Sequence, residues 1–225
     1  MLSKLKALRV DGIDSILKNL EAFESNIKMR PGELDYKRAD WDNGFKDFLA
    51  SIGRLEADLQ SFIKDWIEKP VPTTTVLEIL AMFQPLSKDI NLNMQEAYQD
   101  MLRRYLKQDL VVARGAYNKQ KTEPPGPKNF PPVTARIAWA RQLFKRIDEP
   151  MMIIRPLQIE FKILNTKDGK SCIKTYNQVG TALIEYETMY HQLWIGSVAT
   201  ARESLKGAIL NRSGPEKEYE VNFNT

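Results

Sequence analysis

Residues 131–151 read PPVTARIAWARQLFKRIDEPM, and this stretch decides how the chain is organised. The pair Pro131-Pro132 ends the element before it, because proline lacks a backbone N–H and clashes with the preceding helical turn. An amphipathic helix centred on Trp139 is predicted to follow. Its inner face comprises Ile137, Ala140, Leu143, Phe144 and Ile147. Pro150 and Pro156 are expected to kink this helix rather than end it, since apolar residues continue at the same spacing beyond them.

Upstream, the clearest periodicity runs from Trp41 to Trp66, where apolar residues recur at alternating spacings of four and three. This pattern predicts one long helix over 41–68 whose seam packs against other helices. Leu49, Ile63 and Ile67 widen the seam, which favours a bundle interior over a two-stranded coiled coil. The prolines that follow in KPVP are expected to end the helix at Glu68.

Two more helices are predicted before the proline pair. Thr74 is the expected N-cap of a short helix that closes at Phe83. Asn91 or Asn93 is expected to open a longer helix that runs to about residue 121. The segment 122–132, TEPPGPKNFPP, is too rich in proline for a helix or a central strand, so it is predicted to be an extended connector.

The two ends of the chain carry weaker patterns. A helix is predicted near the N-terminus from Ile13 to Ile27, and its packing partner is left open between this chain and a neighbour. Asp168-Gly169 is expected to form a turn before a last long helix that ends near Leu205. Alternating apolar residues around a Ser-Gly-Pro turn then predict a small β-hairpin.

Together these patterns predict an all-α fold, an elongated array of long-helix bundles with a small C-terminal β-hairpin. The predicted segments are an N-terminal helix and connector (1–40), a first helical bundle segment (41–121), a proline-rich connector (122–132), a second helical bundle segment (133–207) and a hairpin-like end (208–225).

Composition limits the classes of protein to which the chain can belong. Of 225 residues, 43% are hydrophobic and 28% are charged, which is typical of a folded globular protein. No apolar run is long enough to span a bilayer, no signal peptide is expected, and a single cysteine fits a reducing compartment. The 33 basic and 29 acidic residues are mixed along the same helices, which favours solvated surfaces over a nucleic-acid site. A sequence pI near 9.0 keeps the nucleic-acid alternative open.

The sequence contains no convincing catalytic constellation. His191 is the only histidine and Cys172 the only cysteine, too few for a Cys/His metal site, and no phosphate-binding glycine loop occurs. We therefore expect no enzyme activity, no cofactor and no metal, and we predict an interaction or structural protein. Trp, Tyr and Arg dominate the energetics of interfaces when they reach the surface. The candidate packing or partner-contact residues are Trp139, Arg141, Arg146, Tyr186, Tyr190 and Trp194.

The stretch 129–151 resembles the N-terminal tail region of dynein heavy chains. That family carries N-x-P-P-V-x-x-x-I-x-W-A-R-Q-L followed by R-I-x-x-P-M, and this chain matches it at Asn129, Trp139-Ala140-Arg141-Gln142-Leu143 and Pro150-Met151. Downstream, 173–177, 183–187 and 221–224 resemble the family's I-K-x-Y-N, L-x-x-[FY]-E and V-N-F-D. The motif W-A-R-Q-L resembles that of axonemal heavy chains more than that of cytoplasmic ones. Arg136 departs from the small residues that the family usually has before the Trp-centred helix.

The resemblance implies a non-catalytic segment of a longer axonemal heavy chain, whose ATPase motor lies elsewhere in the parent protein. It implies partners among WD-repeat intermediate chains, light chains, other dynein heavy chains, and docking proteins or the doublet microtubule. It also implies a location in the cytoplasm, within the cytoskeleton of the ciliary or flagellar axoneme, without nucleic acid or membrane as a partner. An unrelated helical tether or coiled-coil adaptor is the alternative that the helical pattern alone leaves open.

Overall fold

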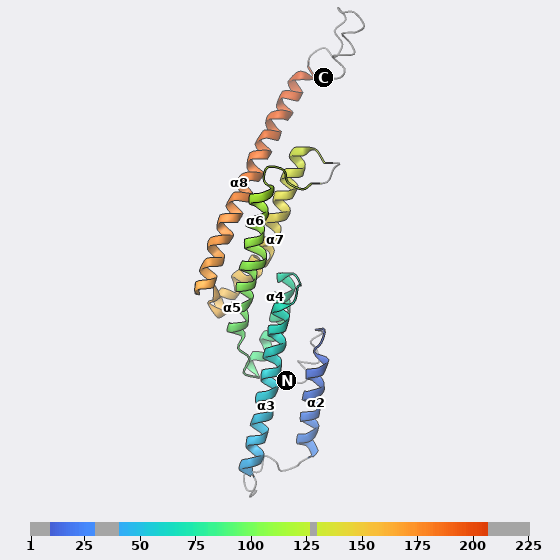
Figure 1. Cartoon of the computed structure of the whole chain (residues 1–225), viewed down its shortest axis with the longest axis vertical. Helices are drawn as coiled ribbons and strands as arrows, with labels where there is room; N and C mark the ends of the chain where they lie inside the picture. The colour runs from blue at the N-terminus through green and yellow to red at the C-terminus, as the bar shows by residue number, and fades with distance from the viewer. Residues whose placement is uncertain (1–9, 30–40, 127–129, 207–225) are drawn as a thin grey trace, which may run out of the picture. The chain divides into compact units, whose positions relative to one another are not determined.

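The computed structural model describes residues 10–29, 41–126 and 130–206. They form helices α2 (Asp14–Met29), α3 (Trp41–Glu68), α4 (Thr73–Phe83), α5 (Met94–Tyr105), α6 (Val111–Gln120), α7 (Pro132–Phe161) and α8 (Lys167–Ser204) (Figure 1). Short 3-10 turns span Gln84–Lys88 and Ile163–Asn165. The predicted all-α class is confirmed for the described residues, among which no strand occurs. The predicted β-hairpin at 208–225 lies outside them and gains no support.

The predicted long helix is confirmed, and α3 has the bounds that its heptads indicate. Leu59 and Ile63 are fully buried on its inner side, as the seam requires. The prediction that Leu49 widens the buried seam is wrong, because half of the surface of Leu49 is exposed. Burial is concentrated from Leu55 onward, where α4 and α5 also pack against α3.

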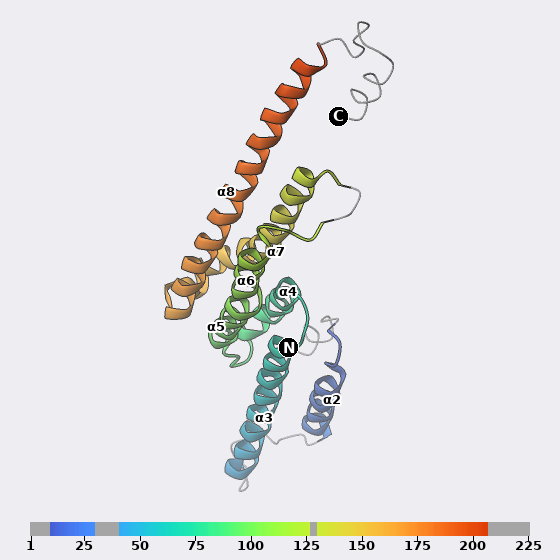
Figure 2. The same cartoon turned by 45° about the horizontal axis from the view of Figure 1, so that its top comes forward.

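Helix α2 packs against helix α3 of the same chain. Val10, Ile13, Ile16 and Leu20 are buried, and α2 lies alongside α3 in both views (Figures 1 and 2). The rings of Phe23 and Phe48 stack with centroids 5.6 Å apart, which anchors the two helices to one another. The open question of the sequence pattern is therefore answered for the described part of α2.

The chain from Met94 to Gln120 runs without a break through α5, a π-helical segment at Leu106–Leu110, and α6. Asn93 is the N-cap, as one of the two predicted candidates, and its side-chain oxygen accepts from the Glu96 N–H at 3.1 Å. Thr74 is not an N-cap, because α4 begins one residue earlier, after Pro72. Thr73, the first residue of α4, donates from its hydroxyl to the Asp109 carboxylate in a tertiary hydrogen bond.

Helix α7 continues through Pro150 and Pro156 to Phe161, which confirms that neither proline ends it. An interior proline costs about 3 kcal/mol of helix stability. Burial on the same face offsets that cost, since Ile147, Met151 and Ile154 are almost entirely covered. The Tyr105 hydroxyl also donates to the Ile147 carbonyl at 2.6 Å and ties this region of α7 to α5.

The predicted turn at Asp168-Gly169 is wrong, because both residues lie in the first turn of α8. The chain reverses instead at Lys162, which has a positive φ of 51°. Gly169 has a different role: a Cβ there would lie 2.4 Å from the Ile163 carbonyl oxygen and 2.5 Å from the Leu164 Cα. Its glycine is needed for close backbone packing, a reason that local turn propensity does not reveal.

The chain divides into two compact units, and each is assembled from separate stretches. The first unit contains residues 1–116 and 145–179, and the second contains 117–144 and 180–225. In the first unit the core comprises Phe83, Leu86, Tyr98, Met101, Leu102 and Tyr105, none more than 1% exposed. The predicted sequential segments, with their boundary at the proline-rich connector, stay a prediction.

Candidate functional site

Four aromatic residues of the second unit pack against one another, and we call them the aromatic cluster: Tyr117, Trp139, Tyr186 and Tyr190. The Trp139 ring lies 5.6 Å from Tyr186 in an edge-to-face arrangement and 6.4 Å from Tyr117 in a stacked one. Tyr186 and Tyr190 have centroids 4.7 Å apart. Each such pair contributes about 0.5–1.5 kcal/mol beyond the area that it buries. The cluster joins the end of α6 to the start of α7 and the middle of α8.

Hydrogen bonds tie this cluster to the C-terminal end of α6. The Tyr186 hydroxyl donates to the Lys121 carbonyl at 2.9 Å, and burial raises the pKa of that hydroxyl. Arg136 donates to the Thr122 carbonyl and to the Tyr190 hydroxyl, both at 2.9 Å. Its guanidinium also lies 4.9 Å from the Tyr190 ring centroid. A cation at a helix C-terminus is favourable because carbonyls there have no partner within the helix.

Arg141 and Glu187 form an ion pair beside the cluster, with 2.6 Å between a guanidinium nitrogen and a carboxylate oxygen. The Arg141 side chain is 67% exposed, so water screens the pair and its contribution to stability is at most about 1 kcal/mol. The Arg141 guanidinium could therefore leave this ion pair at little cost to the fold.

Arg146 lies in the first unit, apart from the aromatic cluster. Its Nε is 3.4 Å from an Asp109 carboxylate oxygen, and its side chain also donates to the Gln108 carbonyl at 3.2 Å. The second Asp109 oxygen accepts from the Thr73 hydroxyl at 2.5 Å. Asp109 belongs to the π-helical segment and is buried, so these contacts satisfy a carboxylate that burial would otherwise penalise.

Trp194 stands outside the aromatic cluster as well. Its indole stacks on His191 with centroids 5.9 Å apart, and 46% of its surface is exposed. The structure therefore brings together three of the six sequence-predicted residues, Trp139, Tyr186 and Tyr190, with Arg141 beside them. It places Arg146 in a polar cluster of the first unit and leaves Trp194 on the surface.

Tyr117 and Arg136 belong to this site as well, although neither was among the residues predicted from the sequence. The sequence marked Arg136 only as a departure from the small residues that the family usually has there. Its partners, however, are the Thr122 carbonyl and Tyr190, which are distant in sequence. Nothing in the sequence around Tyr117 indicated a role in this site, apart from its position near the end of a predicted helix.

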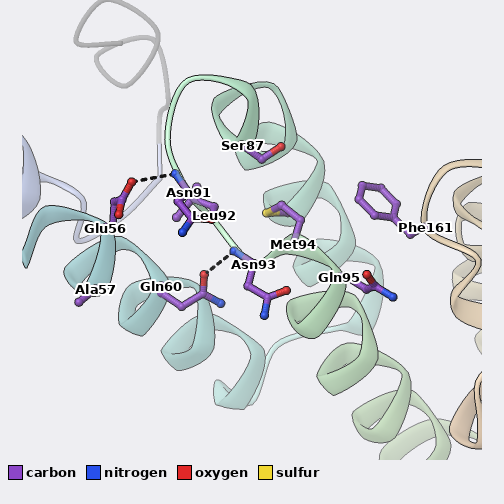
Figure 3. A pocket seen from close by; sticks show the side chains of 10 residues that line it. All are labelled: Glu56, Ala57, Gln60, Ser87, Asn91, Leu92, Asn93, Met94, Gln95 and Phe161. Carbon is purple, nitrogen blue, oxygen red and sulfur yellow. Dashed lines mark hydrogen bonds between the residues drawn. The ribbon is translucent and has the colours of Figure 1, made fainter. Parts of the chain in front are cut away.

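A pocket of about 580 Å³ opens in the first unit between α3 and the start of α5 (Figure 3). Amide and carboxylate side chains dominate its wall, and two of them are bound to the neighbouring backbone. Glu56 accepts from the Asn91 N–H at 2.8 Å, and Gln60 accepts from the Asn93 N–H at 3.1 Å. These bonds hold the loop before α5 against α3. They give the lining a structural role and converge on no single reacting atom.

The described residues offer no group of three or more His, Cys, Asp or Glu side chains that could hold a metal ion. Cys172 is buried, donates weakly to the Leu102 carbonyl, and burial raises the pKa of its thiol to about 12, so it is protonated at neutral pH. Among the helices that the structure describes, none is long and apolar enough to cross a membrane.

Comparisons with known proteins agree with the resemblance noted in the sequence. The family model described as "Dynein heavy chain, N-terminal region 1" matches residues 2–225. The chain is 36% identical over 217 residues to a protein of Chlamydomonas reinhardtii, "Dynein gamma chain, flagellar outer arm", covering 95% of this chain and 5% of that protein. It is 31% identical over 222 residues to mouse "Dynein axonemal heavy chain 5", covering 98% of this chain and 5% of that protein. The chain thus spans about one twentieth of the length of these relatives.

Proposed function

The chain belongs to the dynein heavy chain family, in its N-terminal region 1, and on this premise we propose that it acts as a non-catalytic scaffold in an axonemal heavy-chain tail. It corresponds to the tail region and not to the ATPase motor domains of such a parent protein. The family match along nearly the whole chain is the observation that carries the proposal. It also removes the alternative of an unrelated helical tether.

The proposed partners are WD-repeat intermediate chains, light chains, other heavy chains, and docking proteins or the doublet microtubule of the axoneme. The second unit supports this role by its construction. The aromatic cluster holds the ends of α6 and α7 on α8, while Arg141 and several apolar side chains of α8 stay on the surface. Protein interfaces are enriched in arginine and aromatic residues, and both residue types lie on the surface of the second unit, at Arg141 and Trp194.

Scaffolding also suits the mechanics of the helices. Continuous helices such as α8 resist bending because every turn is hydrogen-bonded to the next. Contacts such as Arg136 to Thr122 then fix neighbouring helix ends against one another. We propose that the segment transmits force between the motor and its attachment without generating force itself.

The test is capture from ciliary extract by the purified chain, with mass spectrometry of dynein intermediate and heavy chains. We expect the wild type to retain them and Arg141→Ala to retain less, with an unchanged circular dichroism spectrum, since Arg141 is exposed. The matched control is Arg103→Ala, which removes another exposed, ion-paired arginine but from the first unit. Recovery of no dynein subunit by the wild type would contradict the proposal, and equal losses in both variants would remove Arg141 from the contact.

A further inference from the structure

The pocket between α3 and the start of α5 is lined mainly by neutral polar side chains. Four side-chain amides reach it from α3, from the loop before α5 and from the first turn of α5, at Gln60, Asn91, Asn93 and Gln95 (Figure 3). Of the ten lining residues, Glu56 alone is ionisable, and all ten belong to the first unit. The pocket therefore suits a ligand with hydrogen-bond donors and acceptors and little charge.

Part of this polar lining is not used by the fold. The side chains of Asn91 and Gln95 form no hydrogen bond with any residue that the structure describes. Gln60 uses only its amide oxygen, for the Asn93 N–H, and Glu56 uses one carboxylate oxygen, for the Asn91 N–H. The pocket thus offers a ligand two complete amide groups, one further amide NH₂ group and one carboxylate oxygen.

The loop that carries these amides is fixed by its own apolar residues. Burial alternates along residues 91–95: Leu92 and Met94 are buried, whereas Asn91, Asn93 and Gln95 are exposed. The two apolar side chains anchor the segment to the core, so the amides between them are presented from a fixed backbone. A site that is already in place loses less conformational entropy when a ligand binds.

The chemistry of the amides points to the kind of ligand. A side-chain amide carries the same donor and the same acceptor as a peptide bond, so it can pair with a main chain through two hydrogen bonds at once. An extended chain repeats such groups at regular intervals. The half-buried ring of Phe161 adds an apolar contact for a ligand side chain, and the unused oxygen of Glu56 favours a basic side chain over an acidic one.

We propose that this pocket binds the main chain of an extended peptide segment of a partner protein, with a basic side chain of that segment beside Glu56. The inference rests on the proposed scaffolding function and specifies it, because it names the site and the chemical class of its ligand. Water competes for every amide in a polar pocket, so one free peptide binds weakly. Within an assembly the segment is tethered, and its effective concentration raises the occupancy of the site.

Titration of the ¹⁵N-labelled whole chain with blocked hexapeptides tests the site by NMR. The probes have alanine at every position except the third, which is Lys, Gln or Glu. We expect the largest shift changes at residues 91–95, and affinities that decrease from the Lys to the Gln to the Glu peptide. N-methylation of the central amides of the Lys peptide removes its main-chain donors and should weaken binding at least about fivefold.

Three variants locate the contacts. Asn91→Ala and Gln95→Ala should each raise the dissociation constant of the Lys peptide about fivefold and leave the circular dichroism spectrum unchanged, since both residues are exposed. Glu56→Gln keeps an acceptor for the Asn91 N–H and should bring the affinities of the Lys and Glu peptides together. The matched control is Gln142→Ala, which removes an exposed glutamine of the second unit and should change nothing.

The absence of shift changes at residues 91–95, equal binding of the N-methylated peptide, or an equal loss in Gln142→Ala would overturn the inference. Binding of maltotriose in the pocket without binding of any hexapeptide would also overturn it, in favour of a carbohydrate site. A chain that binds no hexapeptide but still captures dynein subunits from ciliary extract contradicts the peptide site alone. A chain that binds the Lys peptide but captures no dynein subunit contradicts the proposed function instead.

Discussion

The two units use similar helices but cover them to different extents. In the first unit Phe83, Tyr98 and Tyr105 are completely buried, and the Tyr105 hydroxyl donates to the Ile147 carbonyl. In the second unit the aromatic cluster is packed, yet α8 continues beyond it with Trp194 and Val198 exposed. An apolar helical face therefore predicts burial, but it does not identify the surface that buries it. The core of the first unit is covered by helices of that unit, whereas the side chains described from His191 to Lys206 in α8 are exposed.

The largest effect is expected for a substitution in the buried core of the first unit. Phe83→Ala should lower the free energy of unfolding by about 3–5 kcal/mol, because a fully buried ring is removed and a cavity is left. Urea denaturation followed by circular dichroism measures this loss. The neighbouring Met82 is 44% exposed, so Met82→Ala serves as the matched control and should change stability by less than about 1 kcal/mol. Equal effects would mean that the core is not organised around Phe83.

A smaller effect is expected from the polar cluster of the first unit. Asp109→Ala removes the acceptor of the Thr73 hydroxyl and the partner of Arg146, and should cost about 1–3 kcal/mol in the free energy of unfolding. The companion Arg146→Ala should cost less, since Arg146 is half exposed and can be replaced by water. Chemical denaturation of both variants gives the comparison, and a larger loss for Arg146→Ala would show that Asp109 does not organise the cluster.

In the second unit, Tyr186→Phe removes the hydroxyl that donates to Lys121 while it keeps the ring in the aromatic cluster. The expected loss in unfolding free energy is about 0.5–1.5 kcal/mol. Thermal unfolding measures it, with Tyr117→Phe as a control that retains the same stacking with Trp139. A loss as large as that of Phe83→Ala would indicate that the two units depend on one another for stability.

The smallest effect is expected at the C-terminal end of α8. Leu205→Ala, at a position 73% exposed, should change the unfolding free energy of dilute, monomeric chain by no more than about 0.5 kcal/mol. Denaturation at low and high protein concentration separates an effect on folding from an effect on self-association, because association stabilises only the folded state. A large loss at low concentration would place Leu205 in a core of this chain and weaken the contrast between the units.

Local rules account for much of what the sequence predicted. The α3 bounds follow from its heptads and from the prolines behind it, and Asn93 caps α5 because its side chain reaches the Glu96 N–H. The continuation of α7 through Pro150 follows from apolar residues that keep their spacing. The turn prediction at Asp168-Gly169 was wrong because a glycine can be required by close backbone packing as well as by a turn. Gly169 serves close packing on Ile163 and Leu164 rather than a turn.

For the candidate site, the residue types were predictable and their grouping was not. Trp139, Tyr186 and Tyr190 were singled out from composition and resemblance, but only the fold brings them together with Tyr117 and Arg136. Tyr186 and Trp194 belong to the same apolar pattern along α8, yet Tyr186 is buried and Trp194 is exposed.

By itself, the sequence determined that the chain is helical, which helices are long, and which family it belongs to. Those properties depend on neighbours three or four residues apart and on short motifs, both of which can be recognised along the chain. Only the folded structure shows which apolar faces are covered among the described residues, and that Arg136 binds the chain at the end of α6. These outcomes depend on contacts between residues far apart in sequence, where backbone approach and side-chain packing must be satisfied together.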